Sequence, residues 1–212
     1  MNSIVLDSSN CRSDLCILCA ESGTDKSPYT AGGHRHPYTV PYSLLFEPLR
    51  KKAIKFVEIG VHRGASVLAW RRYFERARIY GFDNDIQNLD FIAAQRWPGV
   101  TVDLMDASNH VSIYEQLTKY SQDGELYDII LDDASHNPEH QVEVIKVALP
   151  FLKQGGLLII EDIFRERTTE PYEKVFQEVK HLVSFHTFIV CDHENRYSPG
   201  WNNDKLLVFV KA

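Results

Sequence analysis

The chain has 212 residues, 44% of them hydrophobic and 25% charged, which is the length and composition of a single globular domain. Its formal net charge of −6 argues against a nucleic-acid partner, because phosphate binding needs a basic surface. No apolar run approaches the roughly 20 residues of a membrane span, and Met1–Asp7 lacks the pattern of a signal peptide, so we expect a cytoplasmic protein without a membrane partner.

Residues 1–40 are rich in Ser, Asp, Gly, Thr and His and show no sustained hydrophobic period. We therefore expect an irregular N-terminal arm, followed by one domain over residues 41–212. Within the arm, Cys16 and Cys19 have the spacing of a zinc knuckle, but a structural zinc site needs a second such pair. Unpaired thiols are the simpler interpretation of these cysteines.

From residue 41 onward, patterns typical of helices and of buried strands alternate. A helical pattern from Pro41 leads into the first expected strand, and Gly155 and Gly156 are expected to precede the fifth. The expected strands are 55–59, 78–82, 100–104, 127–131, 157–160, 185–191 and 205–210, and the expected helices are 66–75, 87–96, 112–120, 138–152 and 172–182. This alternation predicts an α/β fold, Rossmann-like and doubly wound, with a mostly parallel seven-stranded sheet, helices on both faces and an antiparallel last strand.

Acidic side chains follow two of these strands directly. Asp132 and Asp133, with His136 three residues further on, end one strand, and Glu161 and Asp162 end another. In an open parallel sheet, ligands bind outside the carboxyl ends of the strands, so these side chains are expected to meet in one cleft. Such a cleft would hold both metal ligands and a base.

The first strand is followed by a glycine-containing turn. Glu58, Gly60, Gly64 and Ser66 lie at the junction of this strand and its helix, where glycine lets the backbone approach a ligand closely. The middle glycine of a dinucleotide fingerprint falls on His62. NAD is therefore disfavoured as the ligand.

Two further acids end the second and third strands. Asp83 stands about twenty residues after the glycines, where an acid can hold ribose hydroxyls, and Asp106 could accept from an adenine amino group. A solvated carboxylate at a strand end is the simpler interpretation of each acid alone. Together with Glu58, however, they mark three successive strand ends and favour a nucleoside ligand.

These motifs resemble those of the class I S-adenosylmethionine-dependent methyltransferases. The turn from Glu58 to Gly64 is similar to the first motif of that family, Asp83 to its ribose-binding motif, and Asp106 to its adenine-side motif. A narrower set resembles the metal-dependent sugar O-methyltransferases of the macrocin and mycinamicin type: Asp132-Asp-Ala-Ser-His136, His140, Glu161-Asp162, Gly23-Thr-Asp-Lys26 and His36-Pro-Tyr38. Ala134 stands where that family commonly has glycine, and this chain is too short for the additional N-terminal domain of the antibiotic-tailoring members.

The resemblance implies a role for each matching residue, with S-adenosylmethionine and Mg²⁺ (or Mn²⁺) as cofactors. Asp133, Glu161 and Asp162 would bind the metal, and His136, together with Asp133, would be catalytic, the histidine as the general base. The cofactor would be bound by Thr24, Lys26, Glu58, Gly60, Gly64, Ser66, Asp83, Asp106 and Asp132, so that the arm contributes to the site. Tyr38, His140 and Trp201 could contact the acceptor, although the aromatic residues could instead pack a lid onto the sheet.

The expected activity is methylation of a sugar hydroxyl on a glycan terminus, a nucleotide sugar or a glycosylated natural product. A divalent cation that binds two neighbouring hydroxyls lowers the pKa of the one to be methylated. A catechol or another small diol would exploit the same metal, so an O-methyltransferase for such compounds is the alternative. A non-catalytic cofactor-binding module is a further alternative, and a homo-oligomer is left open.

Overall fold

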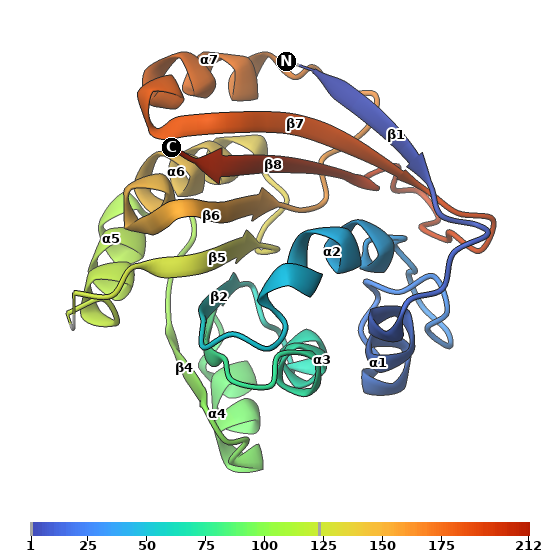
Figure 1. Cartoon of the computed structure of the whole chain (residues 1–212), viewed down its shortest axis with the longest axis horizontal. Coiled ribbons are helices and arrows are strands. Elements are labelled where there is room, and N and C mark those ends of the chain that lie inside the picture. Colours follow the sequence, from blue (N-terminus) through green and yellow to red (C-terminus); the bar gives the residue numbers. More distant parts are fainter. Residues whose placement is uncertain (1, 123) are drawn as a thin grey trace.

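The computed structural model describes residues 2–122 and 124–212, which form one eight-stranded sheet with helices on both faces (Figure 1). The strands are β1 (Ser3–Asp7), β2 (Lys55–Ile59), β3 (Arg78–Asp83), β4 (Val100–Leu104), β5 (Tyr127–Asp132), β6 (Leu152–Ile160), β7 (Val183–Asp192) and β8 (Lys205–Lys211). The helices are α1 (Asp14–Ser22), α2 (Thr39–Phe46), α3 (Ala65–Tyr73), α4 (Ile86–Gln95), α5 (His110–Lys119), α6 (Pro138–Ala148) and α7 (Glu170–Val179). Short 3-10 turns follow three of them, at Glu47–Leu49, Leu149–Phe151 and Lys180–Leu182.

The strand order across the sheet is β1-β7-β8-β6-β5-β2-β3-β4. The pairs from β6 through β4 are parallel, and β8 runs antiparallel to both β6 and β7. The predicted α/β class, the mostly parallel sheet and the antiparallel last strand are confirmed. In this sheet, β2, β5 and β6 lie side by side. The two acidic motifs lie at the carboxyl ends of β5 and β6.

The prediction of seven strands and of an irregular arm is wrong in two places. Ser3–Asp7 forms β1, an eighth strand that pairs in parallel with β7. Asp14–Ser22 forms α1, which the Ser13 side chain caps at its start and which ends at Gly23 in the left-handed conformation. The strand depends on a partner at the other end of the chain, and local composition carries no sign of that pairing. Cys16 and Cys19 lie buried on α1 as free thiols.

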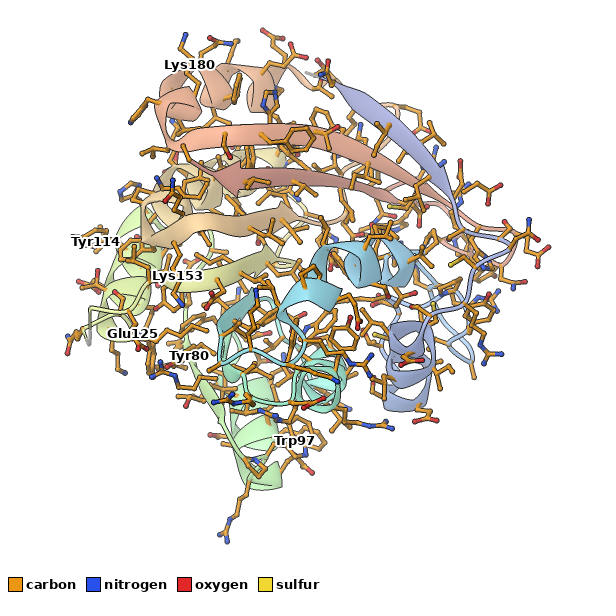
Figure 2. All side chains as sticks on the ribbon, in the orientation of Figure 1. Tyr80, Trp97, Tyr114, Glu125, Lys153 and Lys180 are labelled. Atoms are coloured by element: carbon orange, nitrogen blue, oxygen red, sulfur yellow. The ribbon has the colours of Figure 1, made fainter. Side chains whose placement is uncertain are left out.

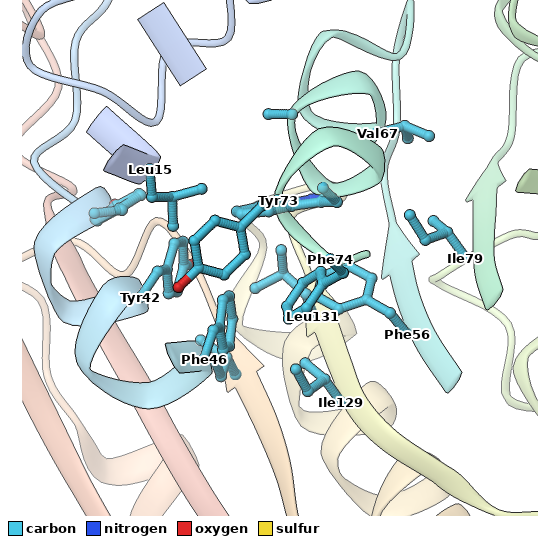
Figure 3. Packing of buried hydrophobic residues seen from close by; sticks show 14 of the residues in the cluster. Leu15, Tyr42, Phe46, Phe56, Val67, Tyr73, Phe74, Ile79, Ile129 and Leu131 are labelled. Atoms are coloured by element: carbon cyan, nitrogen blue, oxygen red, sulfur yellow. The ribbon is translucent and has the colours of Figure 1, made fainter. Parts of the chain in front are cut away.

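Successive residues of the central strands point to opposite faces of the sheet and build two separate cores. Phe56 and Ile129 belong to the core beneath α1–α4, whereas their neighbours Val57 and Ile130 belong to the core beneath α5–α7. Figure 3 shows the first core, where Tyr42, Phe46 and Phe74 pack against residues of the strands. Because both faces are covered, the central strands contain apolar runs, such as residues 129–131 of β5 and 157–160 of β6. Gly155 and Gly156 lie within β6 rather than before it.

Both polar and large apolar side chains are exposed on the outside of this layered structure. Glu125 and Lys180 are exposed and lie at the rim of the molecule, as does the half-exposed ring of Tyr114 (Figure 2). Over residues 2–122 and 124–212, no helix is both long enough and apolar enough to cross a membrane.

Candidate active site

The site is built at the carboxyl ends of β2, β5 and β6. Ile59, Asp132 and Ile160 stand opposite one another in these strands, so that the next residues, Gly60, Asp133 and Glu161, emerge side by side. Backbone hydrogen bonds continue across the strand ends, from the Asp133 N–H to the Ile59 carbonyl at 2.8 Å and from the Glu161 N–H to the Asp132 carbonyl at 2.9 Å. The expected convergence of the two acidic motifs is therefore a property of the sheet register.

Gly60 allows the turn after β2 to touch the turn after β5. Its φ is +89°, and a Cβ atom at this position would lie 2.2 Å from the Asp133 carbonyl oxygen. Only glycine fits such an approach. Two residues further on, the His62 N–H donates to Asp83 Oδ2 at 2.7 Å, which ties the turn to the end of β3.

A cavity of about 430 Å³ lies beside this turn. It is lined by residues that include Gly60, Asp83, Asp106 and His140, which lie at or after the carboxyl ends of β2, β3, β4 and β5. The Asp83 carboxylate also accepts from the Asp85 N–H at 2.9 Å, and that of Asp106 accepts from the Ser108 N–H at 2.9 Å. These bonds fix both acids at the wall of a cavity that suits a nucleoside.

A second cavity, of about 390 Å³, adjoins the first. Both are lined by Gly60, His62, Asp133 and Ala134, so the two are continuous along this wall. The second cavity is also lined by Thr24, Asp25, Ser66, His136 and Asp162. An elongated ligand in the first cavity would thus reach the acidic motifs with its other end.

Asp133, His136 and Asp162 form a compact group at the second cavity. His136 Nε2 lies 3.2 Å from Asp133 Oδ1 and 3.2 Å from Asp162 Oδ2, and one ligand atom from each of the three lies within 4.8 Å of the others. His136 and Asp162 have φ angles of +54° and +58°, a backbone conformation that is strained for these residues and typical of functional sites. Two carboxylate oxygens and an imidazole nitrogen at these separations fit a divalent cation.

The charges of this group shift the pKa values of its members. Burial alone would raise the pKa of Asp133 and lower that of His136, but the ion pairs outweigh burial in both cases. Lys26 and His136 hold the pKa of Asp133 at about 2, and Asp133 and Asp162 raise the pKa of His136 to about 9. A cation bound to the two carboxylates would offset their effect on the imidazole.

Lys26 reaches the acidic group from the arm. Its ammonium donates to Asp133 Oδ2 and, at 2.6 Å, to Glu161 Oε2, and it lies 3.7 Å from Glu58 Oε1. Glu161 Oε1 accepts from the Tyr42 hydroxyl at 2.5 Å, and α2, which carries this tyrosine, lies close to the arrowheads of β5 and β6 (Figure 1). Among the three acids expected to bind metal, Glu161 therefore has both oxygens engaged by side chains.

Tyr38 supports Asp162 instead of facing an acceptor. Its ring is fully buried, and its hydroxyl lies 2.6 Å from Asp162 Oδ1 and 3.0 Å from the Asn203 carbonyl oxygen. Next to it, His36 Nδ1 lies 2.7 Å from Asp204 Oδ1. The structure thus corrects the expected acceptor contact of Tyr38, because a residue without exposed surface cannot touch the substrate.

Trp201 lines the open side of the site. Its ring meets the His136 ring edge to face with centroids 6.1 Å apart, and it lies 5.8 Å from the Phe164 ring. Trp201 is 46% exposed and borders a shallow third cavity together with Ser135, His136, Asn137, Pro138, Phe164, Arg167 and Gly200. An apolar ring beside the candidate metal group is a suitable wall for a sugar or an aromatic acceptor.

Several expected cofactor residues do not line the two joined cavities: Lys26, Glu58, Gly64 and Asp132. Glu58 is fully buried and accepts from Ser66 Oγ at 2.8 Å and Trp70 Nε1 at 3.1 Å. Burial raises the pKa of Glu58 and that of Asp132 to about 7 each. His140 lines the first cavity, and its Nδ1 lies 2.8 Å from Ser135 Oγ. Sequence reasoning did not predict the contacts of Tyr42 and Lys26 with the acids, because neither contact has a local signal.

Known proteins resemble this chain in sequence and in fold. A family model described as a methyltransferase domain matches residues 57–163, about half of the chain. The chain belongs to this family. As expected, curated relatives of this methyltransferase include macrocin- and mycinamicin-type enzymes, with 29% identity to both the demethylmacrocin O-methyltransferase of Streptomyces fradiae and the mycinamicin VI 2''-O-methyltransferase of Micromonospora griseorubida.

Another relative is the 8-demethyl-8-alpha-L-rhamnosyl tetracenomycin-C 2'-O-methyltransferase of Streptomyces olivaceus. It is 33% identical over 135 residues, which are 60% of this chain and 33% of that protein. The demethylmacrocin enzyme is matched over 62% of this chain and 33% of its own length, and the mycinamicin VI enzyme over the same two shares. The matched part is thus about a third of the length of these curated relatives.

Solved structures share the fold. The MycE methyltransferase of the mycinamycin biosynthetic pathway, solved with Mg, SAH and mycinamycin VI, superposes with a TM-score of 0.69 at 20% identity, over 95% of this chain and 55% of that one. A rRNA methylase from Streptococcus thermophilus gives a TM-score of 0.56 at 16% identity, over 85% and 99% of the two chains. At these identities the likeness concerns the fold.

Proposed function

We propose that this methyltransferase uses S-adenosylmethionine and a divalent metal ion to methylate a hydroxyl group of a sugar. The observation that carries the proposal is the position of Asp133, which lines both joined cavities and also belongs to the group with His136 and Asp162. A cofactor along the cavities would therefore end beside a metal ion. The names of the curated relatives, which describe O-methylation of glycosylated natural products, support the same chemistry.

The proposed cofactor site follows the two cavities from end to end. Asp106 would bind the adenine amino group, and Asp83 would bind the ribose hydroxyls by charge-assisted hydrogen bonds. Thr24 and Ser66, at the second cavity, would contact the methionine part. The arm of residues 1–40 would thus complete a site whose main part is formed by the domain of residues 41–212.

The proposed reaction transfers a methyl group that the sulfonium of S-adenosylmethionine already activates. A divalent ion supplies the acidity, because it binds neighbouring sugar hydroxyls and lowers the pKa of the one to be methylated. Asp133, Glu161 and Asp162 would hold the ion, and His136 would accept the hydroxyl proton as the oxygen attacks the methyl carbon. Because the methyl group is already activated, the main task of the chain is to align donor and acceptor. Trp201 would contribute to this alignment by holding the sugar ring.

Product analysis tests this proposal. The purified chain would be incubated with S-adenosylmethionine, Mg²⁺ and a panel of nucleotide sugars, short glycans, glycosylated polyketides and catechols, with mass spectrometry to detect an added methyl group. We expect methylated sugars, and no product from the Asp162→Asn variant. Methylation of catechols alone would favour the small-diol alternative. Tight binding of S-adenosylhomocysteine without any transfer would favour a non-catalytic module.

A further inference from the structure

Gln141 is a buried polar residue next to the turns that form the candidate metal group. It is 2% exposed and lies on α6, one turn after Asn137, whose carbonyl oxygen accepts from the Gln141 N–H at 2.9 Å. His136 directly precedes Asn137, so the candidate base and this helical turn belong to one short segment. A buried amide is destabilising unless it is hydrogen-bonded, which makes its partners informative.

Both ends of the Gln141 amide have a partner. Its Nε2 donates to the Glu161 carbonyl oxygen at 2.8 Å, and its Oε1 accepts from the Tyr172 hydroxyl. Tyr172 lies buried on α7, and burial raises the pKa of its hydroxyl above the ordinary value, so the hydroxyl stays protonated and donates. Because a backbone carbonyl oxygen only accepts, these two partners leave a single orientation for the amide.

The bond from Gln141 ends on the peptide group that joins Glu161 to Asp162, two of the acids proposed to bind metal. The φ of Asp162 is +58°, a backbone conformation that is strained for a residue other than glycine. Since φ is the rotation between this peptide group and the Cα atom of Asp162, a hydrogen bond that fixes the peptide plane opposes relaxation of the strain. The preceding peptide group is held by β5, because the Glu161 N–H donates to the Asp132 carbonyl oxygen.

We infer that Gln141 is a positioning residue of the proposed metal site, which holds the strained turn after β6 in the conformation that brings Asp162 to His136. The inference rests on the proposed function, because it concerns the same metal ion. His136 also has a positive φ, of +54°, and its Nε2 lies 3.2 Å from Asp162 Oδ2. Gln141 thus links, through one amide, the segment that carries the candidate base to the segment that carries two proposed metal ligands.

Repulsion between carboxylates gives the physical reason for a restraint on this backbone. Asp133 and Asp162 each present an oxygen to the same imidazole, and two like charges at such a separation push the turns that carry them apart. A neutral amide opposes this movement without adding a charge that competes with the ion for the carboxylates. A turn that is already held in place also loses less conformational freedom when the ion binds.

Metal affinity tests the role of Gln141. Mn²⁺ binding would be measured by electron paramagnetic resonance on the full chain and on Gln141→Met, which keeps an unbranched side chain of similar length and removes both hydrogen bonds. Loss of an outer partner of a metal site weakens metal binding by about 10–100-fold, and we expect a loss in this range. Affinity for S-adenosylhomocysteine, measured by calorimetry, should stay near that of the unmodified chain, because a buried residue does not touch the cofactor.

Two tyrosine variants supply a graded comparison and a control. Tyr172→Phe removes the partner of Gln141 Oε1 but leaves the bond to the Glu161 carbonyl oxygen, so Mn²⁺ affinity should fall by a few-fold only. Tyr127→Phe also removes a bond from a buried tyrosine hydroxyl to a carbonyl oxygen, that of Leu117 at 2.7 Å. Because Tyr127 begins β5, at the end opposite to the site, this variant should lose stability in urea unfolding and keep its metal affinity.

The possible results separate positioning from a general loss of stability. Unchanged Mn²⁺ affinity in a folded Gln141→Met chain would overturn the inference, with the proposed function intact. Equal losses of affinity in Gln141→Met and Tyr127→Phe would overturn it as well, since lower stability alone would explain them. If Gln141→Met does not fold, Tyr172→Phe decides in its place, and unchanged affinity there would overturn the inference. Failure of the unmodified chain to bind Mn²⁺ would instead refute the metal dependence of the proposed function, and the inference with it.

Discussion

Two buried tyrosines, one turn apart on and before α2, hold two neighbouring acids of the site. Tyr38 lies 2.6 Å from Asp162 Oδ1, and Tyr42 donates to Glu161 Oε1 at 2.5 Å. Burial, with the nearby carboxylates, raises the pKa of both hydroxyls well above the usual value, so both remain protonated donors. The pair therefore offers a matched comparison between Asp162, which lies in the group with His136, and Glu161, which also pairs with Lys26.

We expect Tyr38→Phe to weaken Mg²⁺ or Mn²⁺ binding about tenfold, because loss of an outer hydrogen bond to a ligand has an effect of about 10–100-fold. Tyr42→Phe should change metal affinity less, since Lys26 still donates to the other oxygen of Glu161 and holds this side chain in place. Both variants lose a buried hydrogen bond to an acid, so similar losses of stability, measured by urea unfolding, are the internal control. The opposite order of metal affinities would contradict the assignment.

Two histidines four residues apart allow a second comparison. His136 lies at the candidate metal group, and His140 lines the cavity proposed to bind the nucleoside part of the cofactor. If His136 is the general base, His136→Ala should lower kcat by about 10²–10⁴-fold and retain the affinity for S-adenosylhomocysteine. His140→Ala should act mainly on the KM for S-adenosylmethionine. Steady-state kinetics and calorimetry decide, and near-normal kcat in His136→Ala would assign the proton to another acceptor.

At the scale of residues, the sequence predicted the positions of side chains that lie near strand ends. It did not predict contacts between segments that are far apart in the chain. Asp133, His136 and Asp162 converge because they lie in the turns that follow β5 and β6, and the composition of those strands is visible locally. Lys26 meets its partners 107 and 135 residues further along the chain, so its place depends on how the whole arm folds. The burial of Tyr38 against Asp162 follows from the same packing of the arm. The sequence does not show this packing, and Tyr38 was therefore expected to contact the acceptor.

At the scale of elements, the turn after β2 is the tightest contact of the site. A side chain at Gly60 would collide with the backbone of the turn after β5, whose carbonyl oxygen would lie 2.2 Å from the new Cβ atom. Gly155 in β6 also has a positive φ, of +74°, but has nothing within 4 Å of a built Cβ. The two glycines thus share the backbone conformation and differ in the space around them.

We expect Gly155→Ala to destabilise the fold by about 1–2 kcal/mol, the cost of a left-handed non-glycine residue. Gly60→Ala should cost about 1–3 kcal/mol more, because overpacking forces the two turns apart. The same displacement moves Asp133, so metal affinity should fall in Gly60→Ala alone. Urea unfolding and metal titration of both variants check this, and equal behaviour of the two would show that the turns separate without consequence.

The elements themselves could largely be predicted from local patterns. The expected strands 55–59 and 100–104 coincide with β2 and β4, because short runs rich in apolar residues there are bounded by turns. β1 was missed, since an edge strand needs a partner that the sequence does not show beside it. The start of β6 was placed too late, because its two glycines were interpreted as a break, whereas the strand continues through them.

On the scale of the whole molecule, three distant parts of the chain enclose the site. The arm supplies Lys26 and Tyr38, the ends of β5 and β6 supply the acids, and the segment before β8 supplies Trp201 and Asn203. An antiparallel bridge between Arg35 and Tyr197 joins the first part to the last. A cation that binds Asp133 and Asp162 therefore links elements that otherwise separate on unfolding.

Metal binding should accordingly stabilise the entire fold. A ligand that binds only the folded state adds about 2.7 kcal/mol at a concentration of 100 times its Kd, and for a chain of this size each kcal/mol raises Tm by about 2–4 °C. We expect Mg²⁺ or Mn²⁺ to raise Tm by about 5–10 °C over EDTA, as measured by calorimetry. Asp162→Asn should lose the shift while still binding S-adenosylhomocysteine. An unmodified chain with the same Tm in EDTA and in saturating Mn²⁺ would show that Asp133 and Asp162 hold no ion.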